Sequence, residues 1–212
     1  LHAGQGSGMH THMSLFQGDV NAFHDPNDEM GLSAIARKFM AGILHHAPEF
    51  TAVTNQLVNS YKRMIAGYES PVYVSWARNN RSALIRVPVH KTGKGSSTRI
   101  EYRALDSAAN PYLAYSVILA AGLKGVEENY ELPEEADDNL WSLSRSDAKA
   151  AGLRQLPQDL RQALDLMEES ELVHETLGEH IFELFLKNKQ SEWEAYQGRV
   201  TPFEIERYLP VW

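Results

Sequence analysis

Two histidines and a serine alternate near the start of the chain, directly after a glycine-rich turn. His10, His12 and Ser14 lie in the segment HTHMSLF. If this segment is a β-strand, its period of two places all three polar side chains on one face. Three polar groups on one face indicate a site. The alternative is a pair of hydrogen-bonded histidines beside a turn, because two ligands do not make a metal site.

A second group of residues is rich in arginine. The segments YKRMIAGYESP and ARNNRSALIRVP contain Arg63, Glu69, Arg78, Arg81 and Arg86. Guanidinium groups bind phosphates and carboxylates through two parallel hydrogen bonds. Several arginines on adjacent strands therefore suit a substrate that carries both groups. The alternative is a solvated strand face on which the arginines pair with acidic side chains.

The third group is a carboxylate between two arginines in TRIEYRAL. Arg99, Glu101 and Arg103 alternate along this segment, so in a strand they share one face, and the apolar residues between them share the other. A buried carboxylate in this setting is either part of a structural ion pair or a ligand for a hard metal ion.

Hydrophobic periodicity predicts the elements that position these residues. A helix is predicted from Met30 to His46, with a buried stripe of Leu32, Ile35, Phe39, Met40, Ile43 and Leu44. Between Pro71 and Leu105, the runs VYVSWA, SALIRVPV and TRIEYRAL predict three strands, antiparallel where the connections are short. Asn110 followed by Pro111 predicts the start of a buried helix that covers one face of the sheet.

The rest of the chain divides into a loop and a helical region. Residues 127–138 contain seven acidic residues and a proline, which predicts a surface loop. The segments beyond it are helical in period, and Thr201 and Glu204 have the spacing of a capping box. We therefore expect a sheet-and-helix part with the site motifs at 1–126, an acidic loop at 127–139 and a helical region at 140–212.

Composition excludes several classes of protein. The chain has 212 residues, 43% of them hydrophobic, which is enough to bury a core. A net charge of −8 argues against a nucleic-acid partner, because phosphate contacts need clustered basic residues. Without cysteine, a metal must be bound by His, Asp or Glu. No apolar run suits a membrane span or a signal peptide, so we expect a cytoplasmic protein with no membrane partner.

Four segments together resemble one family. GSGMHTHMSLF, NSYKRMIAGYESP, NNRSALIRVP and RIEYRALDSAANPYL resemble signature segments of bacterial-type glutamine synthetases, in the same order and over nearly the whole chain. The resemblance implies an α+β fold in which helices pack on one side of an antiparallel sheet, related to the guanido kinases. It also implies a homo-oligomer, a dodecamer with active sites between subunits.

The resemblance also implies binding roles for individual residues. His10 and Glu101 match ligands of a divalent metal ion, Mg²⁺ or Mn²⁺, whose usual ligands are oxygen atoms with occasional imidazoles. The positions that match contacts to ATP are His12, Ser14, Arg86 and Arg99. The positions that match contacts to glutamate are Gly6, Arg63, Arg81 and Arg103.

Two further residues resemble catalytic positions of the family, and one resembles a modified position. Arg81 matches the arginine that neutralises the phosphoryl group during transfer, a role that positioned positive charge can fill. Glu69 matches a flap carboxylate that closes the site and deprotonates ammonium. Tyr130 lies in NYELPEE, which resembles a loop whose tyrosine is adenylylated in some members. The implied reaction forms γ-glutamyl phosphate from glutamate and ATP and then glutamine from that intermediate and ammonia.

Two other functions remain open. Ligases that join glutamate to polyamines or other amines share the phosphate and glutamate machinery and differ in the amine pocket. A non-catalytic structural or regulatory relative would tend to lose site residues, whereas this chain keeps all four of His10, Glu69, Arg81 and Glu101. The family's remaining metal-binding glutamates and its N-terminal domain precede these motifs, so we expect this chain to be an incomplete, inactive part of the enzyme.

Overall fold

A four-stranded sheet forms the base of the molecule. The computed structural model describes residues 6–65, 67–68, 70–88, 95–136, 145–150 and 152–211. The strand order is β1-β6-β5-β4. Its strands are β1 Gly8–Met13, β6 Ile100–Asp106, β5 Ile85–Arg86 and β4 Trp76–Ala77. A separate two-stranded ribbon pairs β2 Phe16–Gln17 with β3 Val20–Asn21 across a turn at Gly18, whose φ is 60°.

The sheet is antiparallel except at one edge. β6 pairs antiparallel with β1 and with β5, as predicted from the sequence. β4 and β5 pair in parallel, so the expectation of antiparallel pairing between closely connected strands is wrong there. Parallel strands usually need a long crossover connection. Here each strand is only two residues long. The connection through residues 78–84 is therefore long enough to return the chain from the end of β4 to the start of β5.

The central helix α1, Ala34–Thr54, begins four residues later and ends eight residues later than the predicted helix from Met30 to His46. Ser33 caps its N-terminus by accepting a hydrogen bond from the Ala36 amide. Ile35 was expected in the buried stripe, but its side chain is 40% exposed in the first turn. The helix also continues past Pro48, which cannot donate an amide hydrogen bond to the Leu44 carbonyl. Arg154 Nη2 donates to that carbonyl instead, at 2.9 Å, and so satisfies the acceptor that the proline leaves unpaired.

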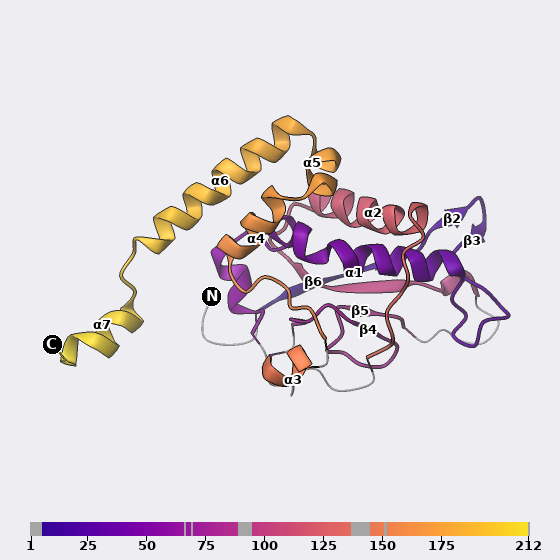
Figure 1. Cartoon of the computed structure of the whole chain (residues 1–212), viewed down its shortest axis with the longest axis horizontal. Helices are drawn as coiled ribbons and strands as arrows, with labels where there is room; N and C mark the ends of the chain where they lie inside the picture. Colours follow the sequence, from indigo (N-terminus) through magenta and orange to yellow (C-terminus); the bar gives the residue numbers. More distant parts are fainter. Residues whose placement is uncertain are drawn as a thin grey trace.

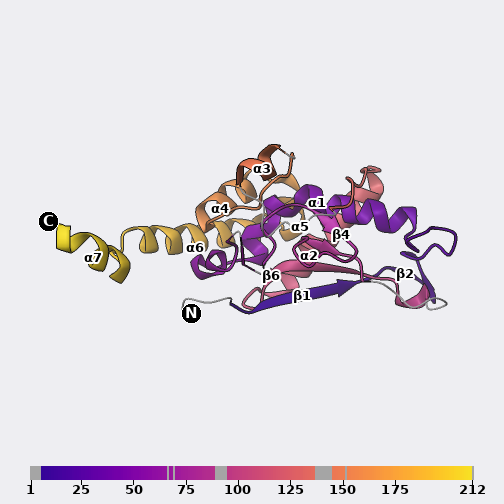
Figure 2. The ribbon, with the colours of Figure 1, turned by 90° about the horizontal axis from the view of Figure 1, so that it is seen from below.

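Helix α2, Pro111–Glu127, packs closely along α1. Asn110 caps it as predicted, its side chain accepting from the Tyr112 amide. The helices α1 and α2 lie on one side of β1 and β6, as Figure 2 shows. Tyr102 of β6 is fully buried against Phe50 of α1, with ring centroids 5.9 Å apart. The predicted covering of one face of the sheet is therefore present.

The C-terminal part of the chain is helical. Its helices are α3 Arg145–Ala150, α4 Leu160–Glu168, α5 Glu171–Leu177, α6 Glu179–Gln197 and α7 Pro202–Tyr208. Of these, α4 packs on α1 and α5 packs on α2. Short 3-10 helices span Val58–Lys62, Gly95–Ser97 and Leu209–Val211. The predicted capping box of Thr201 and Glu204 is present. In Figure 1, α6 and α7 project from the body as an arm.

The acidic segment is an irregular surface loop over the residues that are described. Glu127 is the last residue of α2, and residues 128–136 have no regular secondary structure. Elsewhere, none of the helices in the described ranges is both long and apolar enough to cross a lipid bilayer.

The close contact between α1 and α2 depends on glycine. A Cβ atom added to Gly42 would lie 2.1 Å from the Ala121 carbonyl oxygen and 2.9 Å from the Gly125 Cα atom. These are backbone atoms, which cannot move aside as a flexible side chain can. We expect Gly42→Ala to lower the free energy of unfolding by at least about 1–3 kcal/mol, measured by urea denaturation.

Gly198→Ala is the control for this substitution. A Cβ atom at Gly198 would have its nearest neighbour at 3.7 Å, and its φ of −78° is open to any residue. Its unfolding free energy should therefore change by less than about 1 kcal/mol. Equal stability of the two variants would contradict close helix packing at Gly42.

Candidate active site

The polar face of β1 forms as the sequence predicts. Exposed and partly buried residues alternate along Gly8–Met13, and His10 and His12 are both on the exposed face. Ser14 lies directly beyond the last residue of the strand. All three residues line one cavity of about 420 Å³, together with Tyr115 and others from α1 and α2. This volume is within the range of small-ligand sites.

Three side chains converge on the buried carboxylate of Glu101. Its side chain is 2% exposed. Oε1 lies 2.8 Å from His10 Nδ1 and 2.7 Å from Arg103 Nη1, while Oε2 accepts a hydrogen bond from Arg86 Nε at 2.6 Å. The structure thus brings His10 and Glu101 together although they are far apart in the sequence, as the sequence analysis predicts. The cause is the antiparallel pairing of β1 with β6.

The charge states of this cluster follow from its surroundings. Burial opposes ionisation of Glu101, but the hydrogen bond from Arg86 and the positive charges of Arg103 and Arg86 outweigh it, so the pKa of Glu101 is lowered. Burial and the nearby Arg103 lower the pKa of His10 despite the opposing effect of Glu101. The pair therefore combines an ionised carboxylate with a neutral imidazole. In type, these two donors fit part of the coordination shell of Mg²⁺ or Mn²⁺.

A second, smaller cavity adjoins this cluster. It has a volume of about 60 Å³ and is lined by Gly6, Gly8, His10, Arg63, Tyr68, Ser70 and Arg103. Three of the four residues predicted to bind glutamate are in this lining, and His10 links it to Glu101. Among the described residues, the buried Arg63 Nε and Ser70 Oγ atoms have no hydrogen-bond partner. Orphaned polar atoms of this kind are expected where a polar ligand completes the hydrogen bonding.

Arg63 is held by residues that no sequence pattern identified. Arg63 Nη2 donates to Asn55 Oδ1 at 3.0 Å and to the Ala104 carbonyl at 3.2 Å. A Cβ atom at Gly8 would lie 2.6 Å from Arg63 Nη1, so any larger residue there would displace the guanidinium group. The glycine-rich run before His10 is a signal that could have identified Gly8. The buried Asn55 sits at the end of an apolar helix, where only the tertiary contact reveals its role.

Comparison with known proteins identifies the family. A model of the family described as "Glutamine synthetase, catalytic domain" matches residues 1–208. The chain belongs to this family. It is 58% identical over 204 residues to glutamine synthetase of Mycolicibacterium smegmatis, an alignment that covers 96% of this chain and 46% of that protein. For Staphylococcus aureus glutamine synthetase the identity is 48% over 204 residues, covering 96% of this chain and 45% of the relative.

Solved structures agree with this membership. The fold matches a GmaS/ADP complex with a TM-score of 0.85 and 34% identity, covering 97% of this chain and 46% of that chain. It matches ligand-free GmaS with a TM-score of 0.80 and 35% identity, covering 96% and 45%. The chain therefore has the glutamine synthetase-like fold, and it spans about half the length of the relatives that it matches.

Two of the remaining predicted positions, Arg99 and Arg81, contact other predicted site residues. Arg99 Nε donates to His12 Nδ1 at 3.4 Å, and Arg99 Nη1 donates to the Ser97 carbonyl. The Arg81 side chain is exposed, and its carbonyl accepts from Arg103 Nε at 3.2 Å. Glu69, the predicted flap carboxylate, lies outside the described residues.

Arg78, although it belongs to the arginine-rich segment, is held elsewhere. It forms an ion pair with Glu135 of the acidic loop at 2.8 Å. For this residue the alternative of a paired surface arginine is correct.

Tyr130 is less accessible than an exposed acidic loop suggests. Its ring is partly buried, with its centroid 4.9 Å from that of His45. Its hydroxyl group donates to Glu128 Oε2 at 2.8 Å. Burial and this hydrogen bond raise the pKa of Tyr130, so the phenol is neutral at physiological pH.

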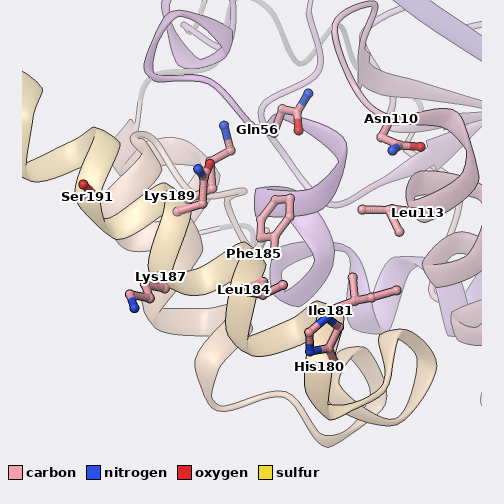
Figure 3. A pocket seen from close by; sticks show the side chains of 11 residues that line it. Gln56, Asn110, Leu113, His180, Ile181, Leu184, Phe185, Lys187, Lys189 and Ser191 are labelled. Carbon is pink, nitrogen blue, oxygen red and sulfur yellow. The ribbon is translucent and has the colours of Figure 1, made fainter.

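Another cavity, of about 790 Å³, lies away from these residues. Figure 3 shows its lining, which comes mainly from α6 with Gln56, Asn110 and Leu113. None of the predicted site residues lines it. It lies at the base of the projecting arm. None of its lining residues belongs to the Glu101 cluster.

The ion pairs of Glu101 should contribute strongly to stability. We expect Glu101→Gln to lower the free energy of unfolding by about 3–5 kcal/mol, because the neutral amide group would leave the buried Arg103 without its ion pair and would turn a donor toward one of the two arginines. Urea denaturation of the 212-residue chain measures this.

Asp165→Asn provides the comparison. Asp165 pairs with Arg161 on the surface of α4, where both side chains are about half exposed. Its replacement should cost less than about 1 kcal/mol. Equal effects of the two substitutions on the free energy of unfolding would contradict a stabilising role for the buried ion pairs of Glu101.

Proposed function

We propose that this chain forms the C-terminal part of the catalytic domain of an enzyme that joins ammonia to the side-chain carboxylate of L-glutamate, with ATP converted to ADP and phosphate. The observation that carries this proposal is the convergence of His10, Arg86 and Arg103 on the buried Glu101, beside a cavity that contains Arg63. Membership of the glutamine synthetase family supports it. We also propose that the fold is related to that of the guanido kinases. We further propose that the protein is located in the cytoplasm.

His10 and Glu101 would hold a divalent ion, Mg²⁺ or Mn²⁺. When bound, such an ion neutralises charge on the phosphates of ATP. The Nδ1 atom of His10 and Oε1 of Glu101 are close enough to serve one ion. Arg86 and Arg103 keep the Glu101 carboxylate ionised and in place.

ATP would lie beside β1, between this strand and α2. His12 and Ser14 line the cavity of about 420 Å³ there, and Arg99 lies beside His12. Arg86 and Arg99 would contact the phosphates, since guanidinium groups bind phosphate oxygens in pairs. Arg86 is already aligned by its hydrogen bond to Glu101.

Glutamate would bind in the smaller cavity. Gly6, Arg63 and Arg103 line it, and Arg81 lies next to Arg103. The fixed arginines would orient the substrate carboxylates, with Asn55 and the Ala104 carbonyl holding the Arg63 side chain. The unpaired Arg63 Nε and Ser70 Oγ atoms offer donors to a bound carboxylate.

Two transfers complete the reaction. First, a glutamate side-chain oxygen attacks the γ-phosphorus of ATP, and ADP leaves. Arg81 would balance the negative charge on the phosphoryl group during this step. Next, ammonia attacks the acyl carbon of γ-glutamyl phosphate and phosphate leaves. Glu69 would accept the proton that ammonium loses and exclude water, which would otherwise hydrolyse the intermediate.

Assembly into a homo-oligomer, a dodecamer in the full enzyme, is part of the proposal. The arm of α6 and α7 leaves large apolar side chains uncovered, among them Val200, Phe203, Tyr208 and Leu209. Apolar groups gathered on a projecting element favour contact with another protein surface. The arm therefore supports a role in subunit contacts.

Adenylylation of Tyr130 is a further part of the proposal. Because its hydroxyl group is hydrogen-bonded to Glu128 and its ring packs on His45, the modifying enzyme would have to displace the loop. Replacement of Glu128 by glutamine should then speed modification.

The amine substrate decides between the proposed function and the amine-ligase alternative. The relatives named glutamine synthetase favour ammonia. With the active enzyme that contains this chain, glutamate and ATP, we expect ammonium to be used in strong preference to methylamine or putrescine. A higher kcat/KM for either organic amine would show an amine ligase, and no amide product with any amine would show a non-catalytic relative. The 212-residue chain alone should form no glutamine.

Arg81→Ala should depress turnover far more than it affects ATP binding. Its contact strengthens only as charge develops on the transferred phosphoryl group, so we expect kcat to fall roughly a thousandfold with little change in KM for ATP. Arg161→Ala, on the surface of α4, is the control and should leave both constants unchanged. Unchanged kcat with a raised KM would make Arg81 a simple binding residue.

Glu69→Gln should separate the two transfers. The glutamine side chain has the same size but cannot accept the proton from ammonium, so phosphate should be released while little glutamine is formed. Both products are measured in the same reaction. The control Glu168→Gln, at the exposed end of α4, should form phosphate and glutamine in equal amounts. A one-to-one ratio in Glu69→Gln as well would remove Glu69 from the mechanism.

A further inference from the structure

A second group of metal-ligating side chains lies on α1, apart from the candidate active site. His45, His46 and Glu49 occupy a little more than one turn of this helix. One possible ligand atom from each residue lies within 4.8 Å of those from the other two. None of these residues lines either of the cavities that contain His10. We call them the α1 cluster.

The three side chains are already oriented toward one another. His46 Nδ1 lies 3.0 Å from both carboxylate oxygens of Glu49. The rings of His45 and His46 meet edge to face, with centroids 4.7 Å apart. His45 is exposed, while His46 is buried. A ligand approaching from solvent would therefore meet His45 first and find the other two groups behind it.

We propose that the α1 cluster is a binding site for a divalent ion that prefers imidazole ligands, such as Zn²⁺. Two ring nitrogens and one carboxylate oxygen form a typical protein ligand set for this ion, with water in the fourth position. Bonds of about 2.0–2.2 Å place tetrahedral ligand atoms roughly 3.3 Å apart. Binding would draw the three ligand atoms, which lie within 4.8 Å of one another, together to this spacing. Mg²⁺, which needs oxygen ligands, is a poor fit.

Side chains from neighbouring elements orient the α1 cluster, as hydrogen-bond partners of metal ligands commonly do. Ser170 Oγ, at the N-terminus of α5, donates to Glu49 Oε2 at 2.6 Å. Such contacts orient first ligands and strengthen metal binding. The Arg154 guanidinium group is the nearby positive charge, and it is engaged by the Leu44 and His45 carbonyl oxygens. Glu49 supplies the compensating negative charge.

The site would also touch the acidic loop. Tyr130 Oη lies 3.5 Å from His46 Nε2 and donates to Glu128. An ion bound to His46 would therefore fix the ring against which Tyr130 packs. Binding would link α1, α5 and the base of the loop.

The test uses Co²⁺, whose visible absorption reports tetrahedral nitrogen and oxygen ligation, with Zn²⁺ as competitor. The parent is the 212-residue chain carrying His10→Ala, which removes the imidazole of the candidate active site. We expect this parent to bind one Co²⁺ ion, displaced by Zn²⁺ and not by excess Mg²⁺. Adding His45→Asn or Glu49→Gln should weaken Co²⁺ binding at least about tenfold.

His180→Asn is the matched control, because His180 is an exposed histidine on α6 outside the cluster. It should bind Co²⁺ as the parent does. Circular dichroism checks that each variant is folded. If Glu49→Gln does not fold, the Co²⁺ affinity of His45→Asn alone tests the proposal, because His45 is exposed and its replacement leaves the core unchanged. The proposal is overturned if the parent binds no Co²⁺, or if His45→Asn binds it as tightly as the parent. The outcome is independent of the proposed ligase activity, which the experiment does not measure.

Discussion

The arrangement of the whole candidate site depends on one buried carboxylate. Glu101 is almost inaccessible to water, so its charge must be balanced by protein groups; Arg86 and Arg103 supply this balance, and the neutral His10 lies within hydrogen-bond distance. Each partner comes from a different position in the sheet: β5, β6 itself and β1. The same contacts that stabilise the charge therefore fix the relative positions of the three strands that carry the binding residues.

The helical layer supports this sheet through unusually close contacts. Gly42 of α1 meets Ala121 and Gly125 of α2 backbone to backbone, which leaves no room for a larger residue. Arg154 reaches back to the Leu44 carbonyl and allows α1 to continue through Pro48. The continued helix ends at Asn55, and Asn55 holds Arg63 in the small cavity. A contact made by an arginine far along the chain thus contributes to the position of a predicted glutamate-binding residue.

Much of the fold was predictable from local patterns. The caps of α2 and α7 rest on side-chain hydrogen bonds between near neighbours, so Asn110, Thr201 and Glu204 identify them in the sequence. The end of α1 was not predictable, because proline normally interrupts a helix and the compensating Arg154 is a long-range partner. The parallel pairing of β4 with β5 was missed for a similar reason, since strand direction at an edge depends on the path of the chain in space.

The sequence by itself determined which residues could do chemistry and which of them share a face. Alternation in β1 and β6 depends only on the two-residue period of a strand, and the family segments are read directly from the residues. Only the tertiary structure decided which faces meet: that His10 contacts Glu101, that Arg63 is held by Asn55, and that Arg78 pairs with the acidic loop instead. The physical reason is that strand register and the direction of long charged side chains are set by packing between distant segments, which no local pattern specifies.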